Sequence, residues 1–131
     1  MLGYVMVGTN DLQNTAKFYD AILAEIGAKR TMDFESFVAW GTDEKSTMFS
    51  ISKPNDGKPA TVGNGTMMAF ATQNPETVDK IYAIALELGG TCEGEPGPRP
   101  NFDPNFYAGY FRDPEGNKCN AFLNIKGRAI F

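Results

Sequence analysis

Histidine is missing from all 131 residues of this chain. It is the commonest metal ligand in proteins, and its ordinary pKa lies closest to neutral pH among the side chains. Its absence excludes zinc sites of the histidine type, Ser-His and Cys-His nucleophile pairs, and imidazole proton shuttles. Acid-base or metal chemistry would therefore have to use carboxylates, Tyr, Lys, Arg or Cys.

Cysteine is scarce, because Cys92 and Cys119 are the only two and neither belongs to a CxxC motif. Two cysteines make no disulfide framework. We expect both to behave as small buried hydrophobic residues.

Basic clusters and long apolar runs are also missing. The formal net charge is −4, and the acidic residues are scattered singly or in pairs. No basic face is available for a nucleic-acid backbone or an anionic membrane. The N-terminal stretch lacks a signal-peptide pattern, and no later segment is long and apolar enough to span a bilayer. We expect a cytoplasmic protein that binds neither nucleic acid nor membranes.

Apolar residues, in contrast, are plentiful: 42% of the chain is hydrophobic and 12% aromatic. This is enough to bury the core of one compact domain without disulfides or metals.

The first half of the chain predicts a strand, a helix and up to three further strands. The stretch GYVMVGT alternates as a strand does, and Asn10-Asp11 offers a cap to a helical segment that Gly27 ends. Short strand candidates follow at residues 31–34, 36–40 and 47–52.

The second half repeats this order. A strand candidate at residues 66–71 precedes Asn74-Pro75-Glu76, a strong helix start, and Gly89-Gly90 stops the helix. A strand near Thr91, a long loop at 94–105 and two strands around the turn DPEGN complete it. Lys17-Phe18-Tyr19 and Lys80-Ile81-Tyr82 match at a shift of 63 positions, which carries Tyr4 onto Met67. We predict two βαβββ modules, residues 2–53 and 66–126, joined by a linker at 54–65.

Two motifs, NDLQNTAKFY in the first predicted helix and RDPEGN before the last strand, resemble the vicinal oxygen chelate superfamily of glyoxalase I, bleomycin-resistance proteins and extradiol dioxygenases. The resemblance implies an α+β fold in which two βαβββ modules form a curled mixed sheet around a pocket. It also implies a homodimer, and the modules pair either within one chain or by exchange between two.

The resemblance further implies four metal-ligand positions, on the first and last strands of each module. Tyr4 and Met67 match the first-strand positions, and Asn120 stands where the family usually has a glutamate. The fourth position lies within residues 47–52, which contain no carboxylate, amide or imidazole, and the sequence does not fix it further. A hard divalent ion needs charged oxygen ligands, so we expect no metal cofactor.

These positions become candidate ligand contacts instead. Tyr4 is a pocket phenol or a core aromatic residue, and Met67 is a soft pocket wall or core filler. Asn120 either orients a polar group of a ligand or is an ordinary strand amide with satisfied hydrogen bonds.

The stretch PGPRPNFDPNFYAGY is a candidate lid. Arg99 would grip a carboxylate or phosphate there, unless it is a solvated surface charge. Tyr107 is a further candidate contact or acid-base group, and Phe49 lines the cavity or belongs to the core. The conspicuous Asp113, Glu115 and Asn117 have the spacing of a hairpin turn, and we expect turn chemistry from them.

The function expected from this pattern is the binding of a small, partly apolar molecule without a metal. The alternative is a lyase, isomerase or dioxygenase-type enzyme of the same superfamily that is metal-independent or recruits other ligands. A third possibility is a protein whose cavity is filled and whose role is interaction. The sequence does not name the ligand.

Overall fold

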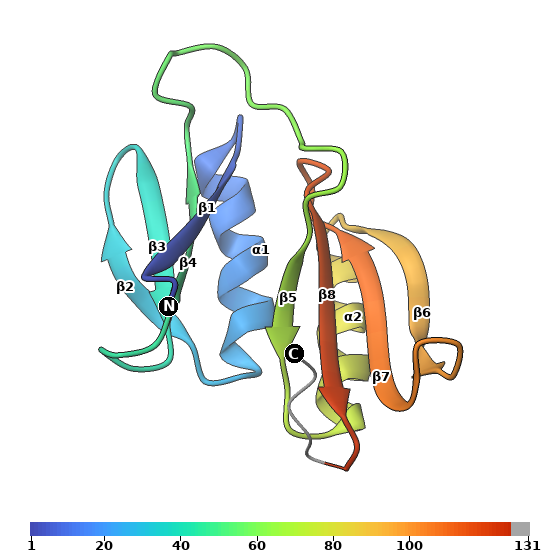
Figure 1. The fold of residues 1–131 in the computed structure, drawn as a ribbon. Coiled ribbons are helices and arrows are strands. Elements are labelled where there is room, and N and C mark those ends of the chain that lie inside the picture. The colour runs from blue at the N-terminus through green and yellow to red at the C-terminus, as the bar shows by residue number, and fades with distance from the viewer. Residues whose placement is uncertain (127–131) are drawn as a thin grey trace. The chain divides into compact units, whose positions relative to one another are not determined.

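The structure, a computed structural model, describes residues 1–126, and the chain divides into two compact units, the first spanning Met1–Gly65 and the second beginning at Thr66. Each unit contains one helix that lies against one face of a four-stranded sheet (Figure 1). The first unit consists of β1 (Tyr4–Gly8), α1 (Leu12–Ala24), β2 (Lys29–Asp33), β3 (Phe37–Gly41) and β4 (Met48–Ser52). The second consists of β5 (Met68–Ala71), α2 (Pro75–Glu87), β6 (Thr91–Arg99), β7 (Asp103–Arg112) and β8 (Lys118–Asn124).

The two sheets have the same topology, with strand orders β1-β4-β3-β2 and β5-β8-β7-β6. In each sheet the first strand runs parallel to the last, and the remaining pairs are antiparallel. The predicted α+β fold of two βαβββ modules is therefore confirmed. Each module has a mixed sheet of its own, and neither sheet closes on itself.

Strand register extends the internal repeat to individual residues. Met6 pairs with Ser50 across β1 and β4, and Ala69 pairs with Asn120 across β5 and β8. The shift of 63 positions carries Met6 onto Ala69, so their partners Ser50 and Asn120 are equivalent. Ser50 is thus the first-module counterpart that the sequence left open within residues 47–52.

The helices begin at the predicted caps and end two or three residues before the predicted glycines, at Ala24 and Glu87. The Asp11 side chain caps α1 by accepting a hydrogen bond from the backbone N–H of Asn14 at 3.1 Å. Asn74 caps α2 through the N–H of Thr77 at 2.8 Å, with Pro75 in the first turn. Gly27, just after α1, has a φ of 78°, a conformation that glycine adopts without strain.

An aromatic cluster joins α1 to its sheet. The ring of Tyr19, which is fully buried, lies 4.6 Å from that of Phe49 and 5.8 Å from that of Trp40, measured between centroids. These three side chains form the centre of the core of the first unit.

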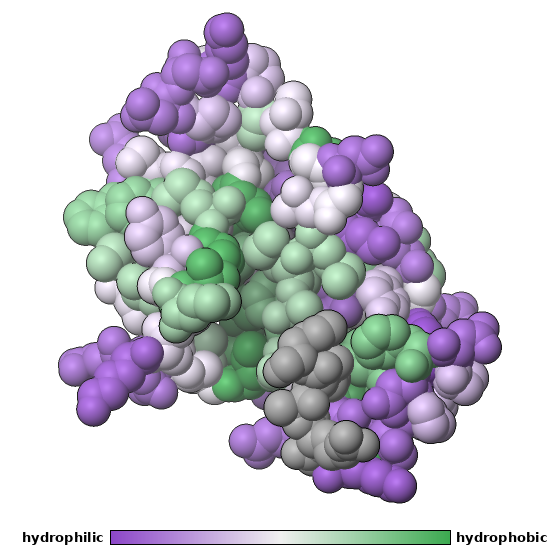
Figure 2. All heavy atoms as spheres, in the orientation of Figure 1, coloured by the Kyte–Doolittle hydropathy of each residue, from purple (hydrophilic) through white to green (hydrophobic). Residues whose placement is uncertain are grey.

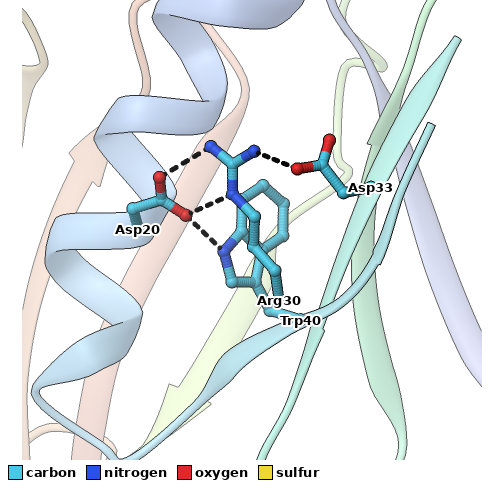
Figure 3. A network of polar contacts seen from close by, with 4 residues as sticks. All are labelled: Asp20, Arg30, Asp33 and Trp40. Carbon is cyan, nitrogen blue, oxygen red and sulfur yellow. Dashed lines mark hydrogen bonds and ion pairs between the residues drawn. The ribbon is translucent and has the colours of Figure 1, made fainter. Parts of the chain in front are cut away.

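Beside this cluster, Asp20 of α1 connects the helix to β2 and β3 (Figure 3). Its carboxylate accepts hydrogen bonds from Arg30 Nε at 2.8 Å and Arg30 Nη2 at 2.7 Å, and from Trp40 Nε1 at 2.9 Å. Arg30 also pairs with Asp33 at 3.0 Å. The hydrogen bonds from Arg30 are the main reason that the pKa of Asp20 lies below its ordinary value.

The prediction of a long loop at residues 94–105 is wrong. Most of it is paired: β6 continues to Arg99, β7 begins at Asp103, and only residues 100–102 connect them. Strand β6 is the edge of its sheet and pairs with β7 through several register shifts. Pro96 and Pro98 are tolerated there because an edge strand has one side on which no N–H has to be donated.

The prediction that both cysteines are buried is half wrong. Cys119 is buried in β8, but Cys92 is exposed. Cys92 lies on the edge strand β6, whose first three residues are all exposed. No helix within residues 1–126 has the length and apolar character needed to cross a membrane.

The DPEGN segment forms the expected turn. Asp113 Oδ1 accepts hydrogen bonds from the backbone N–H groups of Glu115 and Asn117, each at 2.9 Å, and Asn117 Nδ2 donates to Asp113 Oδ2. Both side chains are buried. Their conspicuous polarity is explained by the geometry of the turn.

Candidate functional site

The second unit has a cavity of about 420 Å³ on the sheet face that is turned away from α2. Side chains from β5, β7 and β8 and from the residue before β5 form its floor: Met67, Ala69, Phe106, Tyr110, Asn120 and Phe122. One side is closed by Arg99 at the end of β6 and by Pro100, Asn101 and Phe102 of the β6–β7 connection. Its walls are mainly apolar and aromatic, as is usual for small-molecule sites.

Asn120 is the most unusual residue of this cavity. It lies on β8 opposite Ala69 on one side and Tyr110 on the other, and only 2% of it is exposed. Its Oδ1 atom is buried and has no hydrogen-bond partner among the residues that the structure describes. An unsatisfied buried acceptor costs about 1 to 3 kcal/mol, so this carboxamide weakens the fold.

Arg99 is held in place by its own strand. Its guanidinium donates to the carbonyls of Glu95 at 2.7 Å, Gly97 at 2.8 Å and Pro98 at 3.2 Å. It also lies 5.3 Å above the ring of Tyr110, in the range of a cation-π contact. Arg99 is thus a fixed part of the cavity wall, and several of its donors are already occupied by carbonyls rather than directed at an anion.

The first unit has a smaller cavity of about 280 Å³ at the equivalent place on its own sheet. It is lined by Tyr4, Met6, Met32, Phe37, Ala39, Met48 and Ser50. Hydrophobic residues are visible over the strands of this unit in the space-filling view (Figure 2). Ser50 differs from its counterpart Asn120, because its hydroxyl donates to the carbonyl of Val5 at 2.8 Å.

The structure distributes the six predicted contact residues over several places. Met67, Arg99 and Asn120 line the cavity of the second unit, and Tyr4, which is 62% exposed, lines that of the first. Phe49 and Tyr107 line neither cavity.

Phe49 and Tyr107 lie on the helix-facing sides of their sheets. Phe49 packs against Tyr19 of α1. The hydroxyl of Tyr107 donates to Asp79 of α2 at 2.6 Å, and this bond raises the pKa of Tyr107 to about 12. The pattern of alternate residues explains this, because Tyr107 follows Phe106, which faces the cavity.

Sequence reasoning included Phe106 and Tyr110 only as part of the candidate lid at residues 96–110, and it missed Phe122 and Ala69. The signal was present for Phe122 and Ala69, since each lies two positions from a predicted contact on the same strand or its extension. Phe106 and Tyr110 required the register of β7 against β8, which the sequence does not specify.

Comparison with known proteins places this arrangement in a family. The sequence matches the family model described as the Glyoxalase/Bleomycin resistance protein/Dioxygenase superfamily over residues 1–120. The chain belongs to this superfamily. The fold assignment drawn from the two sequence motifs is therefore confirmed.

Solved structures of the superfamily agree with the assignment. A glyoxalase/bleomycin resistance protein from Albidiferax ferrireducens is 40% identical, with a TM-score of 0.83, and the match covers 93% of this chain and 97% of that one. A glyoxalase-related enzyme from Fulvimarina pelagi is 16% identical over 95% of this chain and 88% of its own, with a TM-score of 0.73. A lactoylglutathione lyase from Agrobacterium tumefaciens is 19% identical over 93% and 92%, with a TM-score of 0.65. The last two share the fold alone. No functionally curated protein matches the chain.

The metal site implied by the superfamily can be tested on the side chains at its four positions. These are Tyr4, Ser50, Met67 and Asn120: a phenol, a hydroxyl that is already bonded, a thioether and a neutral amide. Hard divalent ions require several charged oxygen ligands, and this set offers none. Within residues 1–126, no cluster of three or more His, Cys, Asp or Glu side chains is arranged to hold a metal ion. The side chains at these four positions therefore do not fit a divalent metal ion.

Proposed function

We propose that this superfamily member binds a small, partly apolar molecule in the cavity of its second unit without a metal. The single observation that carries the proposal is the 420 Å³ apolar cavity with one buried, unpartnered polar atom on its floor. A cavity of this size lies within the range of about 300 to 1,000 Å³ that is typical of ligand pockets.

The wall chemistry supports binding over catalysis. The second unit presents aromatic rings, a thioether and an amide to the cavity, and its one charged lining residue, Arg99, is bonded to backbone carbonyls. Tyr107, the acid-base candidate from the sequence, is directed to Asp79, and its raised pKa makes it a poor base near neutral pH.

The experiment is a thermal-shift screen of small aromatic and aliphatic compounds on the purified chain. Binding to the folded state raises the melting temperature, and the rise grows with the logarithm of the ratio of ligand concentration to Kd. The same screen on Ala69→Trp tests the location, because Ala69 is exposed on the cavity floor and a large side chain there fills the space. Ala71→Trp is the matched control, since Ala71 is exposed on the same strand but does not line the cavity.

We expect compounds that stabilise the wild type and Ala71→Trp and leave Ala69→Trp unchanged. A response that persists in Ala69→Trp would place the site elsewhere. Elemental analysis of the same preparation is expected to find no stoichiometric nickel, zinc, iron or manganese. One full equivalent of any of these metals would contradict the metal-free proposal.

A further inference from the structure

The unpartnered oxygen of Asn120 carries information about the ligand. Its equivalent in the first unit, Ser50, sits in the same register position and has a partner in the Val5 carbonyl. A polar side chain at this strand position can therefore find a hydrogen-bond partner within its own sheet. The second unit keeps a buried acceptor without a donor on the floor of its larger cavity.

The neighbours of Asn120 in the cavity do not supply this donor. Phe106, Phe122 and Met67 have no side-chain N–H or O–H group. Arg99 directs its terminal nitrogens to the carbonyls of Glu95, Gly97 and Pro98. Tyr110 and Asn101 also line the cavity and carry side-chain donors, but no residue that the structure describes donates to Asn120 Oδ1. A molecule that fills the cavity can supply this donor.

Aromatic rings dominate the cavity around this acceptor. The rings of Phe106 and Phe122 lie 5.8 Å apart, and that of Phe102 lies 5.1 Å from that of Phe106. Such rings favour a flat ligand that packs against them in offset or edge-on geometry.

We infer that the cavity selects aromatic molecules with a hydrogen-bond donor, an aromatic alcohol or an N–H heterocycle, and that Asn120 Oδ1 accepts this donor. The inference rests on the proposed function and names its ligand class. The hydrogen bond satisfies the acceptor that the empty fold leaves unpaired. An analogue without the donor leaves it unpaired, and such an analogue binds more weakly.

The test uses three probes of similar shape: 1-naphthol, which has a donor, 1-methoxynaphthalene, which has only an acceptor, and naphthalene, which has neither. Their affinities are measured by calorimetry on the wild type, on Asn120→Leu and on Asn64→Leu. Asn64 is the control because it is an exposed amide that lines neither cavity.

We expect the wild type and Asn64→Leu to bind 1-naphthol about tenfold more tightly than the other two probes, as one buried hydrogen bond implies. In Asn120→Leu this preference should fall to less than about twofold, while naphthalene binds at least as well as before. Equal binding of all three probes by the wild type would overturn the ligand class and leave the proposed binding function intact. A preference that survives in Asn120→Leu would remove Asn120 from the site.

The melting temperature of the unliganded variants gives a second readout. Because Leu has a similar volume and no polar atom, Asn120→Leu should melt a few degrees higher than the wild type. A lower melting temperature, in both Asn120→Leu and Asn120→Ala, would show that the amide has a structural partner and would contradict the inference. If none of the three probes binds the wild type, the ligand class fails whatever a broader screen finds.

Discussion

Asp20 shows how one carboxylate can hold three elements together. Asp20 lies on α1, and its carboxylate accepts hydrogen bonds from Arg30 of β2 and from the indole N–H of the buried Trp40 on β3. Removing it leaves a buried donor without a partner and a guanidinium with only Asp33 for a counter-charge. Asn120 is the opposite case, because the fold leaves this polar group unsatisfied.

We expect Asp20→Ala to destabilise the first unit by about 1 kcal/mol at neutral pH, the low end for an orphaned donor, because the Asp20 side chain is 40% exposed and solvent screens the ion pair. Urea unfolding followed by tryptophan fluorescence measures this directly, since Trp40 is the only tryptophan. Asp33→Ala is the control: Asp33 is 63% exposed and touches only Arg30 in this network, so its loss should cost less.

The difference in stability between the wild type and Asp20→Ala should depend on pH. The pKa of Asp20 is lowered in the folded state from an ordinary value of 3.8, chiefly by its hydrogen bonds with Arg30. Its stabilising effect is therefore complete above pH 3.8 and is lost as the pH falls through the lower folded pKa. The difference in stability between wild type and Asp20→Ala should narrow below pH 3.8. A difference that widens in acid would contradict the assignment.

At the scale of elements, helix caps fix where helices begin, and side-chain hydrogen bonds to the backbone fix where connections lie. Asn74 accepts from both the backbone N–H and the hydroxyl of Thr77, each at 2.8 Å. In the connection between β4 and β5, the backbone of Ala60 is tied to Asn10 by two hydrogen bonds, with Asn10 Oδ1 accepting at 2.7 Å and Asn10 Nδ2 donating at 3.3 Å. These contacts bring the connection against the end of β1, where Gly8 leaves room for Ala60.

Asn74→Ala should cost about 1 kcal/mol, the usual value of a lost N-cap. The loss should appear as faster hydrogen exchange in the first turn of α2, with little effect on α1. The neighbouring Gln73→Ala serves as the matched control, because Gln73 is exposed and lies outside the cap. Equal effects of the two substitutions would mean that the cap contributes nothing measurable.

Asn10→Ala should release the connection without unfolding the unit. The amide of Ala60 loses its acceptor, so its hydrogen exchange should accelerate, and NMR resolves this single site. Asn14→Ala, in the first turn of α1, is expected to leave the exchange of Ala60 unchanged. An Ala60 amide that stays protected in Asn10→Ala would show that another group holds it.

At the scale of the whole molecule, the first unit exposes an apolar sheet face. Tyr4, Met6 and Met32 are 62%, 48% and 40% exposed and line its cavity together with Phe37. Contiguous apolar surface of this kind usually marks an interaction site. We propose that the chain forms a homodimer.

Sedimentation velocity at micromolar concentration tests the dimer, and twice the mass of one chain is expected. Met6→Lys and Met32→Lys, which place charges on this face, should shift the equilibrium toward the monomer if the face is the interface. Val62→Lys is the control, because Val62 is 43% exposed and does not line the cavity. A monomer at all concentrations would refute the proposal.

The sequence correctly indicated features that depend on neighbours along the chain. Asp11, Asn74, Gly27 and the DPEGN turn act within a few residues, so their patterns are readable before folding. The loop at 94–105 was misread for the same reason. Its prolines predict turns when only their neighbours along the chain are considered. Proline is nevertheless compatible with a strand at the edge of a sheet, and the sequence does not show which strand lies at an edge.

The sequence by itself determined the order of helices and strands, the internal repeat and the absence of charged metal ligands at the family positions, because each is written in residue types and their spacing. Only the tertiary structure decided that Ser50 is the counterpart of Asn120, that Tyr107 faces α2, and that Phe106, Tyr110 and Phe122 surround an unpaired amide oxygen. The physical reason is that strand register and the facing of side chains arise from pairing between segments distant in sequence, and no local pattern encodes that pairing.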